Sequence, residues 1–139
     1  MSALYQATGV AIGGRGVLIT GAPGSGKSSL ALALIDRGAS LIGDDGVLLE
    51  VEAGRLLASP APNTYGMLEV RNVGIVNRPA LSRVPIALVL QLDDDSPRFV
   101  EQPGHVAIAG IDLPHILLWP GSAVLHLRAE LALELHGLK

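Results

Sequence analysis

The chain has 139 residues, 49% of them hydrophobic, and a formal net charge of −3. This length suits one domain, so we expect residues 1–139 to form a single unit. The mild negative charge gives no electrostatic reason to expect nucleic acid. Cysteine is absent, which excludes disulfides, thiol nucleophiles and cysteine zinc sites. Neither a charged, apolar leader nor an apolar run near the roughly 20 residues of a membrane span is present, so we expect a soluble, cytoplasmic protein.

The first half of the chain is predicted to combine hairpins with one helix. Residues 10–12 and 17–20 are short β-branched runs on either side of a glycine-rich turn, which indicates a hairpin. Leucine and alanine recur at helical spacing in residues 28–37, and Gly38 follows as a stop signal. Residues 41–42 predict a strand that leads into an acidic turn. Residues 47–51 and 56–58 predict a second hairpin.

The second half is predicted to be mostly extended. Residues 59–66 contain two prolines and are expected to form a loop. Residues 67–77 and 84–93 read as strands, and the second is apolar throughout, which is typical of a central strand. Residues 105–121 are extended again. A helix is expected over residues 122–136, with Ser122 as its N-cap and Gly137 as its stop. The chain is therefore predicted to have a compact, strand-rich α/β fold.

A glycine-rich turn separates the run at residues 17–20 from the helix at residues 28–37. It matches GxxxxGK[ST], the P-loop pattern, and the required strand and helix flank it. Glycines let backbone N–H groups turn around an anion, and the start of the helix adds positive potential. The expected nucleotide-binding residues are Gly21, Ala22, Pro23, Gly24, Ser25, Gly26, Lys27, Ser28 and Ser29. Lys27 is expected to reach the outer phosphates, and the Ser28 hydroxyl to bind Mg²⁺.

Two acidic segments compete for the carboxylate that such a site needs near the metal or the attacking group. The apolar run "IALVLQLDDD" ends in three aspartates that begin at Asp93. The segment "SLIGDD" places Asp44 and Asp45 soon after the helix, and its strand is expected to lie beside the strand before the glycine loop. Either acidic segment could also be an ordinary turn, because aspartate is common in turns. The pattern alone leaves the two nearly even.

The segments "GVLITGAPGSGKSSLALALIDRGASLIGDD" and "GMLEVRNVGIVN" together resemble the HPr kinase/phosphorylase family, in a short form without the amino-terminal regulatory domain. The resemblance extends from about Gln6 to about Gly121. It implies a P-loop kinase core that assembles as a homo-hexamer. It also implies the use of ATP and Mg²⁺ to phosphorylate a serine of HPr, the phosphocarrier of the sugar phosphotransferase system.

The resemblance also implies roles for single residues. Lys27 matches the P-loop lysine, and Ser28 matches a metal ligand. Asp45 matches the proton acceptor for the attacking serine, with Asp44 beside it, and Glu69 matches the second metal ligand. These roles make chemical sense, because a serine hydroxyl needs a carboxylate to take its proton and Mg²⁺ prefers hard oxygen ligands.

Two arginines are candidates for the cation that neutralises charge on the transferred phosphoryl group. Arg98, in "RFVEQP", matches the family's catalytic arginine, and Arg71 lies in the second matching segment. An alternative for Glu69 and Arg71 is a plain ion pair on an exposed strand face.

Three departures from the family pattern bear on the reaction. Gln6 stands where the family has a histidine, and Asn72 replaces a signature glycine. The segment "LPHILLWPGSAVL" resembles the partner-facing loop of the family but is shorter and has no arginine. These departures predict weak phosphorylase activity. They also leave open a nucleotide-sensing module without transfer, or a small-molecule kinase on a similar core.

Overall fold

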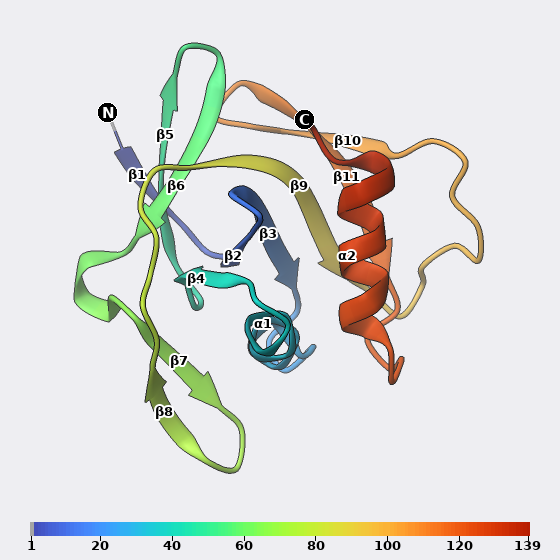
Figure 1. The fold of residues 1–139 in the computed structure, drawn as a ribbon. Coiled ribbons are helices and arrows are strands. Elements are labelled where there is room, and N and C mark those ends of the chain that lie inside the picture. Colours follow the sequence, from blue (N-terminus) through green and yellow to red (C-terminus); the bar gives the residue numbers. More distant parts are fainter. Residues whose placement is uncertain (1) are drawn as a thin grey trace.

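The computed structural model describes residues 2–139. These residues form two α-helices, one short 3-10 helix and eleven strands, which Figure 1 shows in chain order. The helices are α1 (Lys27–Asp36), α2 (Leu125–His136) and the 3-10 helix η1 (Pro62–Thr64). The strands are β1 (Ser2–Tyr5), β2 (Thr8–Ile12), β3 (Arg15–Gly21), β4 (Ser40–Gly43), β5 (Val47–Glu52), β6 (Arg55–Pro60), β7 (Met67–Val70), β8 (Gly74–Asn77), β9 (Val84–Leu92), β10 (Gly104–Ile108) and β11 (Ile111–Leu118).

Strand β9 is the centre of the main sheet, as its apolar sequence predicts. The strands follow the order β1-β5-β6-β9-β3-β2-β4, and the β10–β11 hairpin joins through β11. One edge of β9 pairs in parallel with β3. Its other edge is shared, because β6 pairs near Val84 and Pro85 while β11 pairs from Val89 onward. The strand-rich α/β architecture expected from the sequence is confirmed.

The acidic turn follows β4, and β4 is not adjacent to β3. Strand β2 lies between them, antiparallel to both. The expectation that the strand before Asp44 pairs with the strand before the glycine loop is therefore wrong. The tight turn at Gly13 and Gly14, both with positive φ, brings β2 back beside β3. The connection from β3 through α1 must therefore pass over β2, so that β4 can pair with the far edge of β2.

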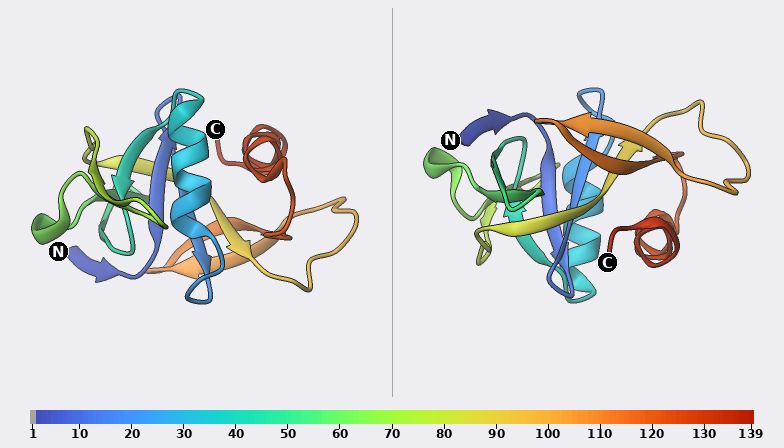
Figure 2. Two further views of the ribbon diagram at one scale, coloured as in Figure 1. Left: turned by 90° about the horizontal axis from the view of Figure 1, so that it is seen from below. Right: turned by 90° about the horizontal axis from the view of Figure 1, so that it is seen from above.

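The sheet buries a different apolar cluster on each face. Side chains alternate in direction along β3, so Ile19 packs with the helices while Leu18 packs on the opposite face. Both helices cover the same face, as Figure 2 shows, and they contribute Leu30, Leu34 and Leu133 to its cluster. This packing fixes the start of α1 relative to the end of β3, where the glycine loop lies.

The carboxyl end of α2 is held by Arg15, at the start of β3. Its Nε and Nη2 atoms donate to the carbonyl oxygen of Leu138 at 3.0 and 2.6 Å, and Nη2 also donates to that of Leu133 at 3.3 Å. About one turn earlier in α2, Glu130 pairs with Arg37, which follows α1, at 2.9 Å. These contacts join α2 to the hairpin and to α1.

The start of α2 differs from the prediction. The helix begins at Leu125, and Ser122 lies ahead of it rather than at its N-cap. The Ser122 hydroxyl accepts a hydrogen bond from the N–H of Val124 at 3.1 Å, which makes a local turn. Ser122 therefore stabilises the approach to the helix. Gly137 ends the helix as expected, although with an extended backbone rather than a left-handed one.

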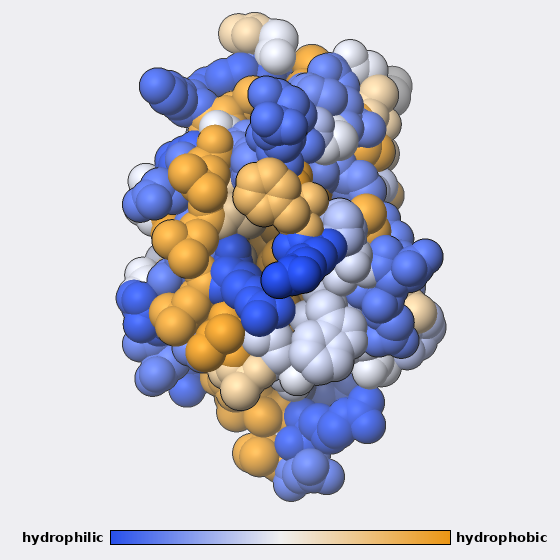
Figure 3. Space-filling view, turned by 90° about the vertical axis from the view of Figure 1, so that its right-hand side faces the viewer, coloured by the Kyte–Doolittle hydropathy of each residue, from blue (hydrophilic) through white to orange (hydrophobic). Residues whose placement is uncertain are grey.

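Exposed leucines lie on α2 and just past its end. Leu131, Leu135 and Leu138 are 53%, 72% and 45% exposed. Figure 3 views the side of the molecule on which α2 lies, and it shows a column of hydrophobic side chains next to hydrophilic ones. Neither helix among residues 2–139 has the length and apolar character needed to cross a bilayer.

Residues 67–77 form a hairpin, not the single strand that the sequence predicts. Strands β7 and β8 pair only with each other. The chain reverses at Asn72, whose φ of 71° is left-handed, and the N–H of Val73 donates to the carbonyl of Val70 at 3.0 Å. Asparagine tolerates this backbone better than most residues, so it is a turn signal that the strand prediction overlooked.

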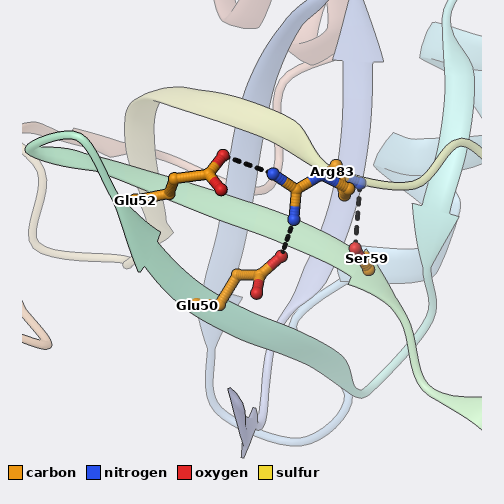
Figure 4. A network of polar contacts seen from close by, with 4 residues as sticks. All are labelled: Glu50, Glu52, Ser59 and Arg83. Carbon is orange, nitrogen blue, oxygen red and sulfur yellow. Dashed lines mark hydrogen bonds and ion pairs between the residues drawn. The ribbon is translucent and has the colours of Figure 1, made fainter. Parts of the chain in front are cut away.

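The chain returns from this hairpin to the main sheet through Arg83. As Figure 4 shows, the Arg83 guanidinium bridges Glu50 and Glu52 of β5, and the Arg83 backbone N–H donates to the Ser59 hydroxyl at 2.8 Å. Ser59 was expected in a loop, but β6 continues to Pro60. These contacts fix the start of β9 on the β5–β6 hairpin.

Candidate functional site

The glycine loop connects the end of β3 to the start of α1. Gly21, Gly24 and Gly26 have φ values of 150°, 79° and 105°, which side-chain-bearing residues rarely adopt. A Cβ at Gly21 would lie 2.6 Å from the Ser25 hydroxyl oxygen. That oxygen is buried and has no hydrogen-bond partner among the described residues. The loop conformation therefore depends on glycine at these positions.

The first turn of α1 faces an open space. Among the described residues, no side chain caps the helix, and the first turn contains no acidic residue. Unpaired N–H groups at a helix start favour an anion. The ammonium of Lys27 donates to the carbonyl oxygens of Gly21 and Ala22 at 3.0 and 3.2 Å, so it lies across the loop. The loop and helix together fit a phosphate group.

A cavity of about 1000 Å³ opens in front of the loop. Its walls come from four parts of the chain: the β1–β2 segment, the glycine loop with α1, the acidic turn and the β7–β8 hairpin. Sequence-predicted residues on the walls are Gly21, Pro23, Gly24, Gly26, Lys27, Ser28, Ser29, Asp44, Asp45, Glu69 and Arg71. The structure thus brings most of the predicted residues to one cavity.

Asp44 is the residue that joins these walls. Its Oδ1 atom accepts hydrogen bonds from the Ser28 hydroxyl at 2.6 Å and from the Thr8 hydroxyl at 3.1 Å. Its Oδ2 atom accepts from the backbone N–H of Glu69 at 2.9 Å. A carboxylate with three donors is well satisfied. One side chain thereby ties α1, β2 and β7 together.

Asp45 is held differently. Its φ of 57° is left-handed, and its N–H donates to the Thr8 hydroxyl oxygen at 3.3 Å. The residue is exposed and lines the cavity. Thr8, which is fully buried, was missed by the sequence reasoning. A lone hydroxyl in the apolar segment "ATGVAI" was the only signal, and it does not distinguish a site residue from a structural one.

Glu69 and Arg71 reach the cavity from the β7–β8 hairpin. Among the described residues no ion pair joins them, so the structure does not support the alternative of a plain pair. The Nη2 atom of Arg71 lies 3.8 Å from the place where a Cβ on Gly24 would stand. The guanidinium therefore overhangs the glycine loop, where it can meet an anion bound there.

Arg98 and Asp93 do not line this cavity. Arg98 is exposed in the segment between β9 and β10. Asp93 follows β9 beside the end of β3, but its carboxylate accepts from the Asp95 N–H at 2.8 Å and from the Gln91 side chain at 3.1 Å. These bonds make it a turn residue. Neither residue therefore lines the cavity around Lys27, although Asp93 follows the β9 residue that pairs with Gly21.

The fold and the site define a strand-rich domain with a glycine-rich loop of the P-loop pattern beside two aspartates. The HPr serine kinase C-terminal domain family matches residues 2–84. This match covers more than half of the chain, so the chain belongs to that family.

Two curated relatives have the same description, HPr kinase/phosphorylase. The protein of Clostridium acetobutylicum is 40% identical over 122 residues, which cover 78% of this chain and 40% of the relative. That of Clostridium tetani is 50% identical over 68 residues, which cover 49% of this chain and 22% of the relative. The chain therefore spans less than half the length of these relatives.

The structure of the HPr(Ser) kinase/phosphatase from Coxiella burnetii is similar over nearly its whole length. The two structures superpose with a TM-score of 0.85 at 30% sequence identity, over 95% of this chain and 94% of the other. The likeness therefore includes α2 and the β10–β11 hairpin, which lie beyond the residues that the family matches.

Proposed function

We propose that residues 1–139 act as one catalytic domain that transfers a phosphoryl group from ATP to a serine of HPr. The observation that carries this proposal is the Asp44 network. It joins a glycine-rich loop, a potential metal ligand and the β7–β8 hairpin in one cavity, next to Asp45, which is exposed and lines that cavity. Family membership and the names of the relatives support HPr as the substrate.

The glycine loop supplies the nucleotide site. The backbone of Gly21 to Ser29, including Ala22, Pro23 and Ser25, would surround the phosphates of ATP at the start of α1. Lys27 would leave the loop carbonyls, which are weak partners for an ammonium, to contact the outer phosphates. The cavity of about 1000 Å³ is large enough for a nucleotide.

Ser28 and Glu69 would hold Mg²⁺. Because the Ser28 hydroxyl donates its proton to Asp44, its lone pairs face away from that bond and are free for a cation. No group of three histidine, aspartate or glutamate side chains is poised for a metal within residues 2–139. That fits Mg²⁺, which commonly uses one or two protein ligands together with phosphate and water. The ion would neutralise phosphate charge.

Asp45 would accept the proton of the attacking serine. Its side chain is exposed to the cavity and, unlike that of Asp44, accepts no hydrogen bond among those found in residues 2–139. Arg71 would stabilise charge on the transferred group from its place above Gly24. Arg98 would need a partner or a movement of its segment to act in this way.

With HPr as its substrate, the protein would act in the cytoplasm, and a homo-hexamer is the assembly that the family resemblance implies. Phosphorylase activity would be weak. The reverse reaction brings phosphate close to phosphoserine, and the resulting repulsion calls for a cation or a proton donor. Gln6 lines the cavity where the family has a histidine, and its amide carries neither a charge nor a titratable proton.

The nucleotide and metal roles can be tested by calorimetric titration with ATP, with and without Mg²⁺. Wild-type protein should bind ATP more tightly with Mg²⁺, and Glu69→Gln should lose most of that gain while keeping metal-free binding. Asp94→Asn, on the exposed turn after β9, is the matched control and should behave as wild type. Equal affinities with and without Mg²⁺ in the wild type would contradict the metal site. ATP binding without transfer would favour a nucleotide-sensing module.

A further inference from the structure

Thr8 stands apart from the rest of the core. It is the one buried polar or charged residue found within residues 2–139, with an exposed fraction of 0%, and it lies between the buried residues Ala7 and Val10. Buried hydroxyls are accommodated only when they are hydrogen-bonded. Both partners of this hydroxyl belong to the acidic turn, although that turn lies more than thirty residues further along the chain.

The direction of the two hydrogen bonds follows from the chemistry of the partners. The backbone N–H of Asp45 can only donate, so the Thr8 oxygen accepts from it at 3.3 Å. The ionised carboxylate of Asp44 can only accept, so the Thr8 proton points to Oδ1 at 3.1 Å. A hydroxyl can serve both bonds at once, and a side chain that lacks a hydroxyl can serve neither.

We propose that Thr8 is a positioning residue that sets both aspartates at once. Its bond to the Asp45 N–H holds that residue in a left-handed backbone, from which the side chain reaches the cavity. Its bond to Asp44 fixes the carboxylate that also receives the Ser28 hydroxyl. Thr8 therefore links the position of the proton acceptor to the position of the metal ligand. The chemical part of this inference rests on the proposed function.

Loss of the hydroxyl should affect both bonds without changing the volume of the residue. Thr8→Val has nearly the same shape, but it leaves the Asp45 N–H without a partner and removes one of three donors from Asp44. Thr8→Ser keeps the hydroxyl. Thr64→Val is the matched control, because Thr64 is exposed in η1 and does not line the cavity.

The test combines two readouts that do not require phosphoryl transfer. The first is Mn²⁺ affinity in the presence of ATP, measured by electron paramagnetic resonance. Thr8→Val should weaken it by about tenfold, the lower end of the effect seen when residues behind metal ligands are changed. The second is hydrogen exchange of the Asp45 amide in protein without nucleotide, which should become faster in Thr8→Val. Thr8→Ser and Thr64→Val should resemble wild type in both.

The two readouts separate the inference from the function beneath it. Wild-type Mn²⁺ affinity and unchanged Asp45 exchange in a folded Thr8→Val protein would overturn the role of Thr8. If Thr8→Val does not fold, hydrogen exchange of the Asp45 amide in the wild type is the deciding measurement. That amide should be protected although the residue is exposed, and an unprotected amide would overturn the inference. If wild-type protein binds no Mn²⁺ with ATP, the proposed function fails. The exchange result would still decide whether Thr8 holds the turn.

Discussion

Replacement of Asp44 by asparagine should destabilise the protein even without any ligand. Asp44 accepts three hydrogen bonds, two at Oδ1 and one at Oδ2. Asparagine offers only one acceptor oxygen. If that oxygen faces the two hydroxyls, the amide NH₂ meets the donating N–H of Glu69. If the side chain is flipped, the two hydroxyls must reorganise. A hydrogen bond to a charged group contributes about 1.5–3 kcal/mol, so we expect a loss of about 2–3 kcal/mol.

Thermal unfolding of the metal-free protein measures this loss. For a chain of this length, 1 kcal/mol corresponds to a shift of roughly 3–4 °C in Tm, so Asp44→Asn should unfold about 6–12 °C lower. Asp94→Asn is the control, because Asp94 is exposed, and its stability should stay within about 0.5 kcal/mol of wild type. A Tm for Asp44→Asn that equals that of the control would show that the network does not hold the site together.

Five further substitutions probe the remaining roles. Lys27→Ala should severely weaken ATP binding, measured by calorimetry, because the outer phosphates lose their main cation. An unchanged affinity would refute the P-loop assignment. Asp45→Asn should lose transfer but keep nucleotide affinity, whereas Asp93→Asn should have little effect on transfer; the reverse pair of results would identify Asp93 as the essential acid. Arg15→Ala should lower stability by about 2 kcal/mol in a urea titration, since α2 loses its bonds to the start of β3, and an unchanged midpoint would contradict that anchor. Gln6→His should raise the rate of pyrophosphate release from serine-phosphorylated HPr in excess phosphate. If the wild type already releases pyrophosphate at a rate comparable to the forward reaction, the prediction of weak phosphorylase activity is refuted.

Local patterns predicted most of the secondary structure. The glycine pair before β3, the leucine spacing of α1 and the apolar run of β9 each depend on neighbours in sequence, and each produced the expected element. The prediction failed where a single turn residue decided the outcome. Asn72 reverses the chain in the middle of a stretch whose apolar residues alone predict one strand.

The arrangement of the site was harder to predict, because it depends on strand order. Nothing in "SLIGDD" shows that β2 lies between β4 and β3. Pattern alone also could not choose between the two acidic segments. The fold places Asp44 and Asp45 at the cavity and binds the Asp93 carboxylate into a turn. Thr8 is found only from the structure, because its partners are distant in sequence.

In the proposed reaction, this cavity transfers a phosphoryl group from ATP to a serine of HPr. The most direct measurement is the intact mass of HPr after incubation with the protein, ATP and Mg²⁺, followed by fragmentation to locate the modified residue. We predict the added mass of one phosphate on a serine, and no addition with the Lys27→Ala variant. Unmodified HPr, from a protein that calorimetry shows to bind ATP, would contradict the claim.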